Sequence, residues 1–174
     1  MKATLEAINQ MQADGVIGKY AIGGAVGATL YLEPAATLDV DIFVTLPTAP
    51  SGLLLSLAPI YDYLRAHGGT VQGEYIVVGG WPVQFLPACD ELDQEAVEEA
   101  VTTTVEGVTT RVMSAEHLLA IALRTGRSKD HLRISQLLRQ EAVDLDRLGK
   151  ILERHGLSSK WRVVKATSLK GDHE

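Results

Sequence analysis

The sequence predicts an α/β fold in which a sheet of short strands is followed by a helical C-terminal region. Up to about residue 112, short runs rich in Val, Ile and Phe alternate with segments of helical periodicity. From Ser114 onward the pattern is helical only. We therefore expect an α/β core over residues 1–112 and a helical region over residues 113–174.

Composition narrows the functions that the chain can have. It has 174 residues, of which 46% are hydrophobic, and a formal net charge of −6, so we expect one sizeable core and no extended face for nucleic-acid backbones, which Lys and Arg would have to neutralise. Cys89 is the one cysteine, which rules out an internal disulfide and a cysteine-rich zinc site. No stretch has the length of a membrane span, and the N-terminus is typical of an amphipathic helix, so we expect a cytoplasmic protein.

The elements of the core follow from apolar spacing and from glycine and proline breaks. Leu5, Ile8 and Met11 recur at helical spacing. Val- and Ile-rich runs predict strands, and paired glycines between them predict turns. The predicted elements, in order, are a helix over residues 2–13, a strand that ends before Gly23, a short helix over 25–32, a strand over 38–46, a long helix over 51–68 capped by Ser51, two strands within 70–88 that turn at Gly79-Gly80, an acidic helix over 90–101 and a strand pair about Gly107.

The C-terminal region is predicted to contain helices with one apolar face each. Leu and Ile recur on one face of the segments 114–126, 128–142 and 144–156. The last dozen residues, "VVKATSLKGDHE", are polar, and we expect them to be frayed.

One stretch of the core combines two features with chemical meaning. A glycine pair, Gly23 and Gly24, ends the first strand, and Asp39 and Asp41 lie about fifteen residues later in the next one. Side chains at i and i+2 of a strand face the same side, about 6–7 Å apart, so the two carboxylates form one surface while Val40 and Ile42 point to the core. Carboxylate oxygens suit a hard cation such as Mg²⁺, and a glycine turn at a helix start suits a phosphate.

The residues "IGG(A)…T-x-D-x-D-I-F-V" resemble the signature of the nucleotidyltransferase-fold superfamily, whose members share the catalytic core of DNA polymerase beta. The nearest resemblance is to small bacterial proteins grouped with minimal nucleotidyltransferases and abortive-infection toxins. The resemblance implies a short mixed sheet flanked by helices. It also implies that Gly23 and Gly24 contact a nucleoside triphosphate and that Asp39 and Asp41 bind Mg²⁺.

The resemblance extends to "VMSAEHLLAIALRTGRSKDHLRISQLL", which is similar to the helix pair that follows the core in these proteins. It implies that Arg127, Lys129 and Asp130 lie near the active cleft, with Lys129 as a phosphate contact. The alternative is a solvated helix start in which the helix dipole favours Asp130 in the first turn.

The sequence departs from the family pattern where a third carboxylate is often found. The central position of "WPVQFLPA" is Gln84, whose carbonyl can ligate a cation but supplies neither negative charge nor a general base. Glu74, one strand earlier, could substitute, although an exposed turn residue is the simpler interpretation. Ala35 replaces an Arg that many relatives have before the aspartates, and Ala25 replaces a hydroxyl-bearing residue after the turn.

Two functions stay open, and with them whether the chain is an enzyme. The first is Mg²⁺-dependent transfer of a nucleoside monophosphate from a nucleoside triphosphate to the hydroxyl of an unidentified acceptor, with Asp39, Asp41 and Gln84 at the metal and Gly23, Gly24 and Lys129 at the nucleotide. The second is a catalytically impaired module of the same fold that binds a nucleotide or a partner protein, as in a toxin–antitoxin pair. An accidental D-x-D in an unrelated α/β protein is a third interpretation.

Overall fold

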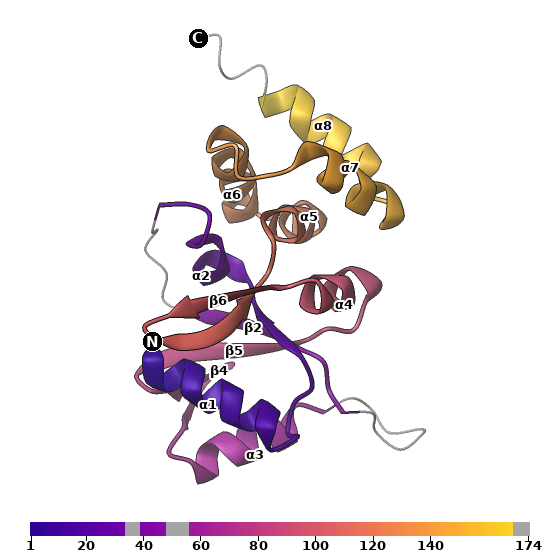
Figure 1. Cartoon of the computed structure of the whole chain (residues 1–174). Coiled ribbons are helices and arrows are strands. Elements are labelled where there is room, and N and C mark those ends of the chain that lie inside the picture. Colours follow the sequence, from indigo (N-terminus) through magenta and orange to yellow (C-terminus); the bar gives the residue numbers. More distant parts are fainter. Residues whose placement is uncertain (34–38, 48–55, 169–174) are drawn as a thin grey trace. The chain divides into compact units, whose positions relative to one another are not determined.

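The computed structural model describes residues 1–33, 39–47 and 56–168. Within them, strands with helices between some of them extend up to Val112, and only helices follow (Figure 1). The helices are α1 (Lys2–Ala13), α2 (Gly24–Ala28), α3 (Ala58–Ala66), α4 (Glu91–Glu98), α5 (Ala115–Thr125), α6 (Ser128–Arg139), α7 (Leu145–Arg154) and α8 (Ser158–Ser168). The strands are β1 (Tyr20–Ile22), β2 (Val40–Val44), β3 (Thr70–Gln72), β4 (Tyr75–Val78), β5 (Trp81–Pro87), β6 (Val101–Val105) and β7 (Val108–Val112).

The seven strands of the described residues form one mixed sheet in the order β3-β4-β5-β2-β1-β7-β6. β2 runs parallel to β5 and β1 runs parallel to β7, whereas the other neighbours are antiparallel. This confirms the predicted class, a short-stranded mixed sheet with flanking helices. β2 lies at the centre of the sheet, so its residues have neighbours on both sides.

Helices cover both faces of this sheet (Figure 1). α1 and α3 lie on the face where alternate strand residues join the main apolar core, and α4 packs on β1 and β2 from the other face. Val40 and Ile42 are fully buried in that core, as their alternation with the two aspartates predicts. The side chain of Asp41 therefore lies on the face opposite the core of α1 and α3.

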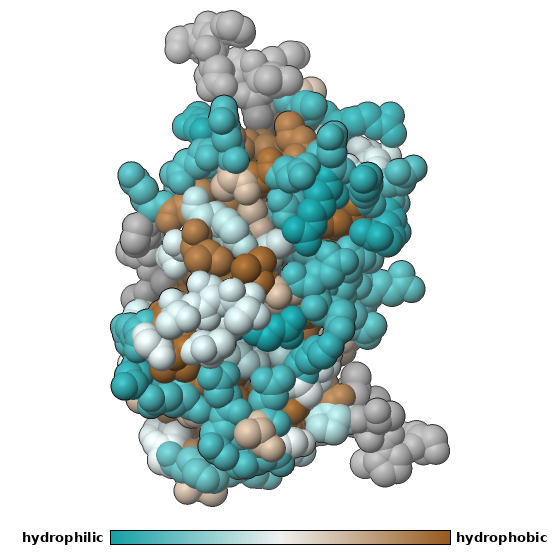
Figure 2. Space-filling view, in the orientation of Figure 1, coloured by the Kyte–Doolittle hydropathy of each residue, from teal (hydrophilic) through white to brown (hydrophobic). Residues whose placement is uncertain are grey.

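The described residues divide into two compact units. The first takes in the described residues among 1–30 and 35–113, and the second those among 31–34 and 114–174. The core of the second unit is built from one face each of α5, α6 and α7, with Leu119, Ile134 and Leu148 fully buried. On the side shown in Figure 2, hydrophilic residues cover most of the surface of each unit. None of the described helices is long and apolar enough to cross a bilayer.

The turns follow the predicted glycines, with one addition. Gly79 and Gly80, both at positive φ, join β4 to β5, and Glu106 and Gly107, also at positive φ, join β6 to β7. Positive φ at both residues gives a two-residue loop the backbone twist that matches the right-handed twist of the flanking strands. The segment predicted as one strand before Gly79 is instead two strands. Gly73, at φ +63°, and Glu74 form a further two-residue loop between β3 and β4.

Two helix predictions are corrected. α3 begins at Ala58 rather than at the predicted position of Ser51, which lies outside the described residues; Pro59 is in the first turn, where its fixed φ and missing amide are best tolerated. The tail predicted to be frayed is helical up to Ser168, because α8 starts after the left-handed Gly156 and the amide of Trp161 donates to the carbonyl of Leu157 at 3.0 Å. Residues 169–174 lie outside the described part.

Candidate active site

Gly23 is placed beside Asp41 by the pairing of β1 with β2. The register that pairs Ile22 with Ile42 continues to these residues, and the Gly23 amide donates to the Asp41 carbonyl at 2.9 Å. A Cβ on Gly23 would lie 2.7 Å from the ring of Phe43 and 3.3 Å from the sulfur of Met113. Gly23 thus permits close packing, and the sheet uses its amide, so this amide does not donate to a phosphate.

Gly24 is required for a different reason. Its φ is +58°, and a Cβ built on it would lie 1.8 Å from Oδ2 of Asp41. The Asp41 carboxylate therefore occupies the space that any side chain at position 24 would need. The first amides of a helix have no intrahelical acceptor, so the amides of Gly24 and Ala25, at the start of α2, are the donors that this turn presents beside the carboxylate.

The sheet register sets polar groups side by side across three central strands. Asp41 on β2 is directly opposite Gln84 on the parallel strand β5. The register that pairs Ile76 with Val83 puts Tyr75 of β4 next to Gln84. Directly opposed residues in a sheet point to the same face, so the side chains of Asp41, Gln84 and Tyr75 share one face.

Asp39 lies immediately before β2 and completes this group. The hydroxyl of Tyr75 is hydrogen-bonded to its carboxylate, and the negative charge of Asp39 is the main cause that raises the pKa of the Tyr75 hydroxyl, with smaller contributions from slight burial and from Glu74 and Asp41. Tyr75 thus senses both aspartates, which places them on the same side of the sheet. Tyr75 was not predicted from the sequence, because its position beside Asp39 depends on the two-residue loop at Gly73.

Glu74 also lies at this face. The β3–β4 loop brings its carboxylate to 3.4 Å from the side-chain amide nitrogen of Gln84, and the hydroxyl of Tyr61 donates to its main-chain carbonyl at 3.2 Å. An acidic group thus lies beside the position where the family pattern often has its third carboxylate.

The donors of this group are all oxygens. The carboxylates of Asp39, Asp41 and Glu74 and the amide carbonyl of Gln84 come from neighbouring segments of one sheet, although oxygens of the three carboxylates do not all lie within 4.8 Å of one another. Hard divalent cations prefer such ligands, and Mg²⁺ is bound by one or two carboxylates together with substrate phosphates. The chemistry of the donor set therefore fits Mg²⁺, whereas nitrogen or sulfur ligands for a softer metal come from none of these four residues.

The basic element predicted to contact the nucleotide belongs to the second unit. Lys129 is exposed in the first turn of α6, and its assignment to phosphate stays a prediction. Asp130 is 1% exposed; its carboxylate accepts from the amide of Arg127 at 3.1 Å and from Nε of the same residue at 2.9 Å. Burial alone would raise the pKa of Asp130, but the hydrogen bonds from Arg127 and the charges of Arg127 and Arg133 outweigh it and lower the pKa. Asp130 thus caps the start of α6, in the first turn as the alternative interpretation expects, but it is buried rather than solvated.

Comparison with known proteins gives a likeness of structure. No family model matches the sequence, and no curated protein sequence matches it significantly. The solution structure of the antibiotic-resistance factor ANT(2'')-Ia is 15% identical with a TM-score of 0.54, covering 95% of this chain and 96% of that one. A crystal structure of ANT(2'')-Ia in complex with adenylyl-2''-tobramycin gives 15% and 0.53, covering 90% of this chain and 96% of that one.

A third solved structure agrees with these two. It is an antigenic nucleotidyltransferase-like protein from Paracoccidioides brasiliensis, 16% identical with a TM-score of 0.52, covering 92% of this chain and 90% of that one. At such identities the likeness concerns the fold. It extends over nearly the whole length of each protein, and together with the sheet order it identifies the architecture. The chain has the fold of the nucleotidyltransferase superfamily.

Proposed function

We propose that this protein is a Mg²⁺-dependent nucleotidyltransferase that moves a nucleoside monophosphate from a nucleoside triphosphate to an acceptor hydroxyl. The observation that carries the proposal is the seat of the Asp41 carboxylate against Gly24, where a Cβ would lie 1.8 Å from Oδ2. A phosphate bound at the backbone of Gly24 would lie beside the Asp41 carboxylate, so a metal ion on that carboxylate could also bind the phosphate. The nucleotidyltransferase fold favours a functional role for the two aspartates over an accidental D-x-D.

Mg²⁺ held by Asp39 and Asp41 would neutralise charge on the triphosphate and stabilise the leaving pyrophosphate. The residues of the chain then supply position and proton transfer. The amides of Gly24 and Ala25 orient the phosphates without a side chain in the way.

Glu74 is the carboxylate that we assign as general base. Gln84 has an amide and cannot act as a base, whereas Glu74 has a carboxylate, which lies 3.4 Å from the side-chain nitrogen of Gln84. The proton of the acceptor hydroxyl passes to Glu74 as the oxygen attacks the α-phosphorus and pyrophosphate leaves. Tyr75 orients Asp39 through its hydroxyl.

The test is pyrophosphate release with each of the four nucleoside triphosphates, Mg²⁺ and a panel of hydroxyl acceptors. We expect Asp41→Asn and Asp39→Asn to lower the rate at least about 100-fold and to weaken Mn²⁺ binding measured by electron paramagnetic resonance. Asp146→Asn, an exposed aspartate in the second unit, is the matched control. Equal Mn²⁺ affinity in the wild type and both site variants would refute the metal assignment.

The second candidate is a nucleotide-binding module without catalysis, and Gln84 in place of an acid is the observation that favours it. Nucleotide binding that Asp41→Asn weakens, with no pyrophosphate released from the nucleoside triphosphate in the presence of any acceptor, would establish this alternative. A partner protein is then the remaining role for the fold, in line with the resemblance to toxin–antitoxin components.

A further inference from the structure

The two edges of the sheet differ in how open they are to another strand. Edge strands invite pairing unless they are short, charged, bulged or interrupted by proline. β3 is one edge; it has three residues and lies between Gly69 and Gly73. β6, the other edge, has the sequence Val-Thr-Thr-Thr-Val, without charge or proline, and within the described residues it pairs only with β7.

The hydrogen bonds of β7 show which groups of β6 point outward. On β7 and just after it, the Thr109 carbonyl accepts from the side chain of Asn9 at 2.8 Å, and the Met113 amide donates to the Ile22 carbonyl at 3.0 Å. Odd-numbered positions of β7 thus direct their backbone groups toward β1 and even-numbered ones toward β6.

The same alternation applies across the β6–β7 ladder. Thr103 pairs with Thr110, so the main-chain groups of Thr103 point toward β7. Its neighbours Thr102 and Thr104 then direct their amide and carbonyl groups away from β7, at the edge of the sheet. Both threonines are exposed.

This edge is complementary to itself. A two-fold axis at Thr103 pairs Thr102 with Thr104 of a second copy and Thr104 with its Thr102, which makes two hydrogen-bonded pairs with four N–H···O bonds. Thr103 then faces its own copy in a non-hydrogen-bonded pair, and Val101 faces Val105. The sequence Val-Thr-Thr-Thr-Val is symmetric about Thr103. The positions whose main-chain groups point outward, Thr102 and Thr104, are symmetric about the same residue.

The charges that flank β6 agree with this pairing. In the same register, Glu106 is opposite Ala100 of the second copy rather than opposite a carboxylate. Glu106 is also neutralised within its own chain, because its Oε2 accepts from the amide of Lys2 at 2.6 Å and lies 3.5 Å from the charged N-terminus of Met1. We propose that β6 is a homodimer interface, in which antiparallel β6 strands of two copies join their sheets into one. A closed two-fold contact of this kind is isologous and stops at two copies.

The experiment uses sedimentation velocity over a concentration series of the full chain. We expect a concentration-dependent dimer. The double variant Thr102→Lys with Thr104→Lys sets lysine opposite lysine at both hydrogen-bonded pairs and should raise the dimer dissociation constant at least about tenfold. The double variant with glutamate at both positions should do the same. Thr109→Lys is the control, because Thr109 is exposed on β7, which lies inside the sheet.

Mixing the lysine and glutamate variants separates the proposal from a loss of folding. Each lysine then faces a glutamate, so a heterodimer should form that neither variant forms alone. A wild type that stays monomeric throughout the series, a dimer that the lysine variant leaves unchanged, or a mixture without heterodimer would each overturn the proposal.

Discussion

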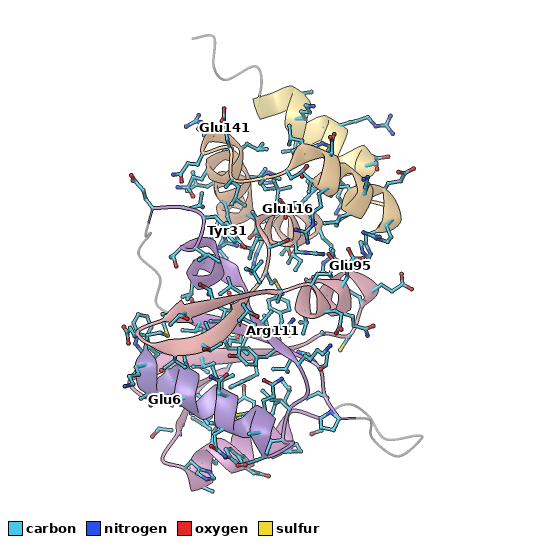
Figure 3. The ribbon with its side chains drawn as sticks, viewed as in Figure 1. Glu6, Tyr31, Glu95, Arg111, Glu116 and Glu141 are labelled. Atoms are coloured by element: carbon cyan, nitrogen blue, oxygen red, sulfur yellow. The ribbon has the colours of Figure 1, made fainter. Side chains whose placement is uncertain are left out.

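The acids at the candidate site of the first unit and two buried acids of the second unit have different kinds of neighbour. In the first unit, the recorded neighbours of Asp39 and Asp41 include a phenol, an amide and a glycine turn. In the second, Asp130 is bound by Arg127, and Glu116 on α5, labelled in Figure 3, accepts from the Asp144 amide at 2.9 Å and lies 3.3 Å from Arg147.

This difference separates acids that stabilise the fold from acids that we propose to serve a ligand. Buried carboxylates with arginine partners and amide donors contribute to the native state. Acids gathered on one face of a sheet repel one another, and a bound cation would relieve that repulsion. Removing the first kind should destabilise the protein, whereas removing the second should cost function with little loss of stability.

The largest effect that sharpens the contrast is expected from Gly24→Ala. The new Cβ forces the Asp41 carboxylate to move, and a misplacement of about 1 Å in a catalytic group costs on the order of 100-fold in rate. Gly15→Ala is the control, because Gly15 has a similar φ of +72° with no atom within 4 Å of the added Cβ. Both variants should lose about 1–2 kcal/mol from backbone strain. Pyrophosphate release measured beside thermal unfolding would contradict the model if the two variants were equally active.

Asp130→Ala should have the opposite effect and lower stability without affecting metal binding. The change leaves the amide of Arg127 and two guanidinium groups without their carboxylate, and we expect the free energy of unfolding to fall by about 2–4 kcal/mol. Mn²⁺ affinity should not change. Urea unfolding of this variant beside Asp146→Ala, an exposed acid in the first turn of α7, measures the difference; equal stabilities would mean that the cap is dispensable.

The unfolding free energies of the wild type and of Asp130→Ala should become more similar in acid. Because the pKa of Asp130 is lowered in the folded state, its stabilisation is fully present above the unfolded pKa of about 3.9 and is lost as the pH falls through the folded pKa. The difference in unfolding free energy between the wild type and Asp130→Ala should therefore be constant near neutrality and shrink below about pH 4. A difference in unfolding free energy that stays constant as the pH falls below about 4 would show that the charge of Asp130 does not cause the stabilisation.

The smallest effect concerns Tyr75. Since the charge of Asp39 raises the pKa of its hydroxyl, Asp39→Asn should lower that pKa toward the ordinary value, and Mg²⁺ bound at the site should act in the same direction. Ultraviolet difference titration of phenolate, with Tyr75→Phe to identify the signal, measures both shifts. A Tyr75 pKa that is the same with and without Mg²⁺ would count against a cation beside Asp39.

The sequence predicted the parts of the site that depend on local spacing. The i, i+2 rule placed Asp39 and Asp41 on the face opposite to Val40, and Gly79-Gly80 and Gly107 marked two of the hairpins. The roles of the individual glycines were not predictable, because Gly23 is defined by the ring of Phe43 and the sulfur of Met113, which are distant in sequence. Tyr75 joined the site only through the Gly73-Glu74 loop, and α8 was missed because its half-exposed face has little apolar periodicity.

The contact between Gly24 and Asp41 has a genetic consequence. Two residues that compete for one volume are coupled, so the effect of a change at one depends on the other. In a library selected for folding alone, alanine at position 24 should survive mainly with serine or glycine at position 41. In a library selected for nucleotidyl transfer, neither member of the pair should vary, and the double variants that rescue folding should all be inactive.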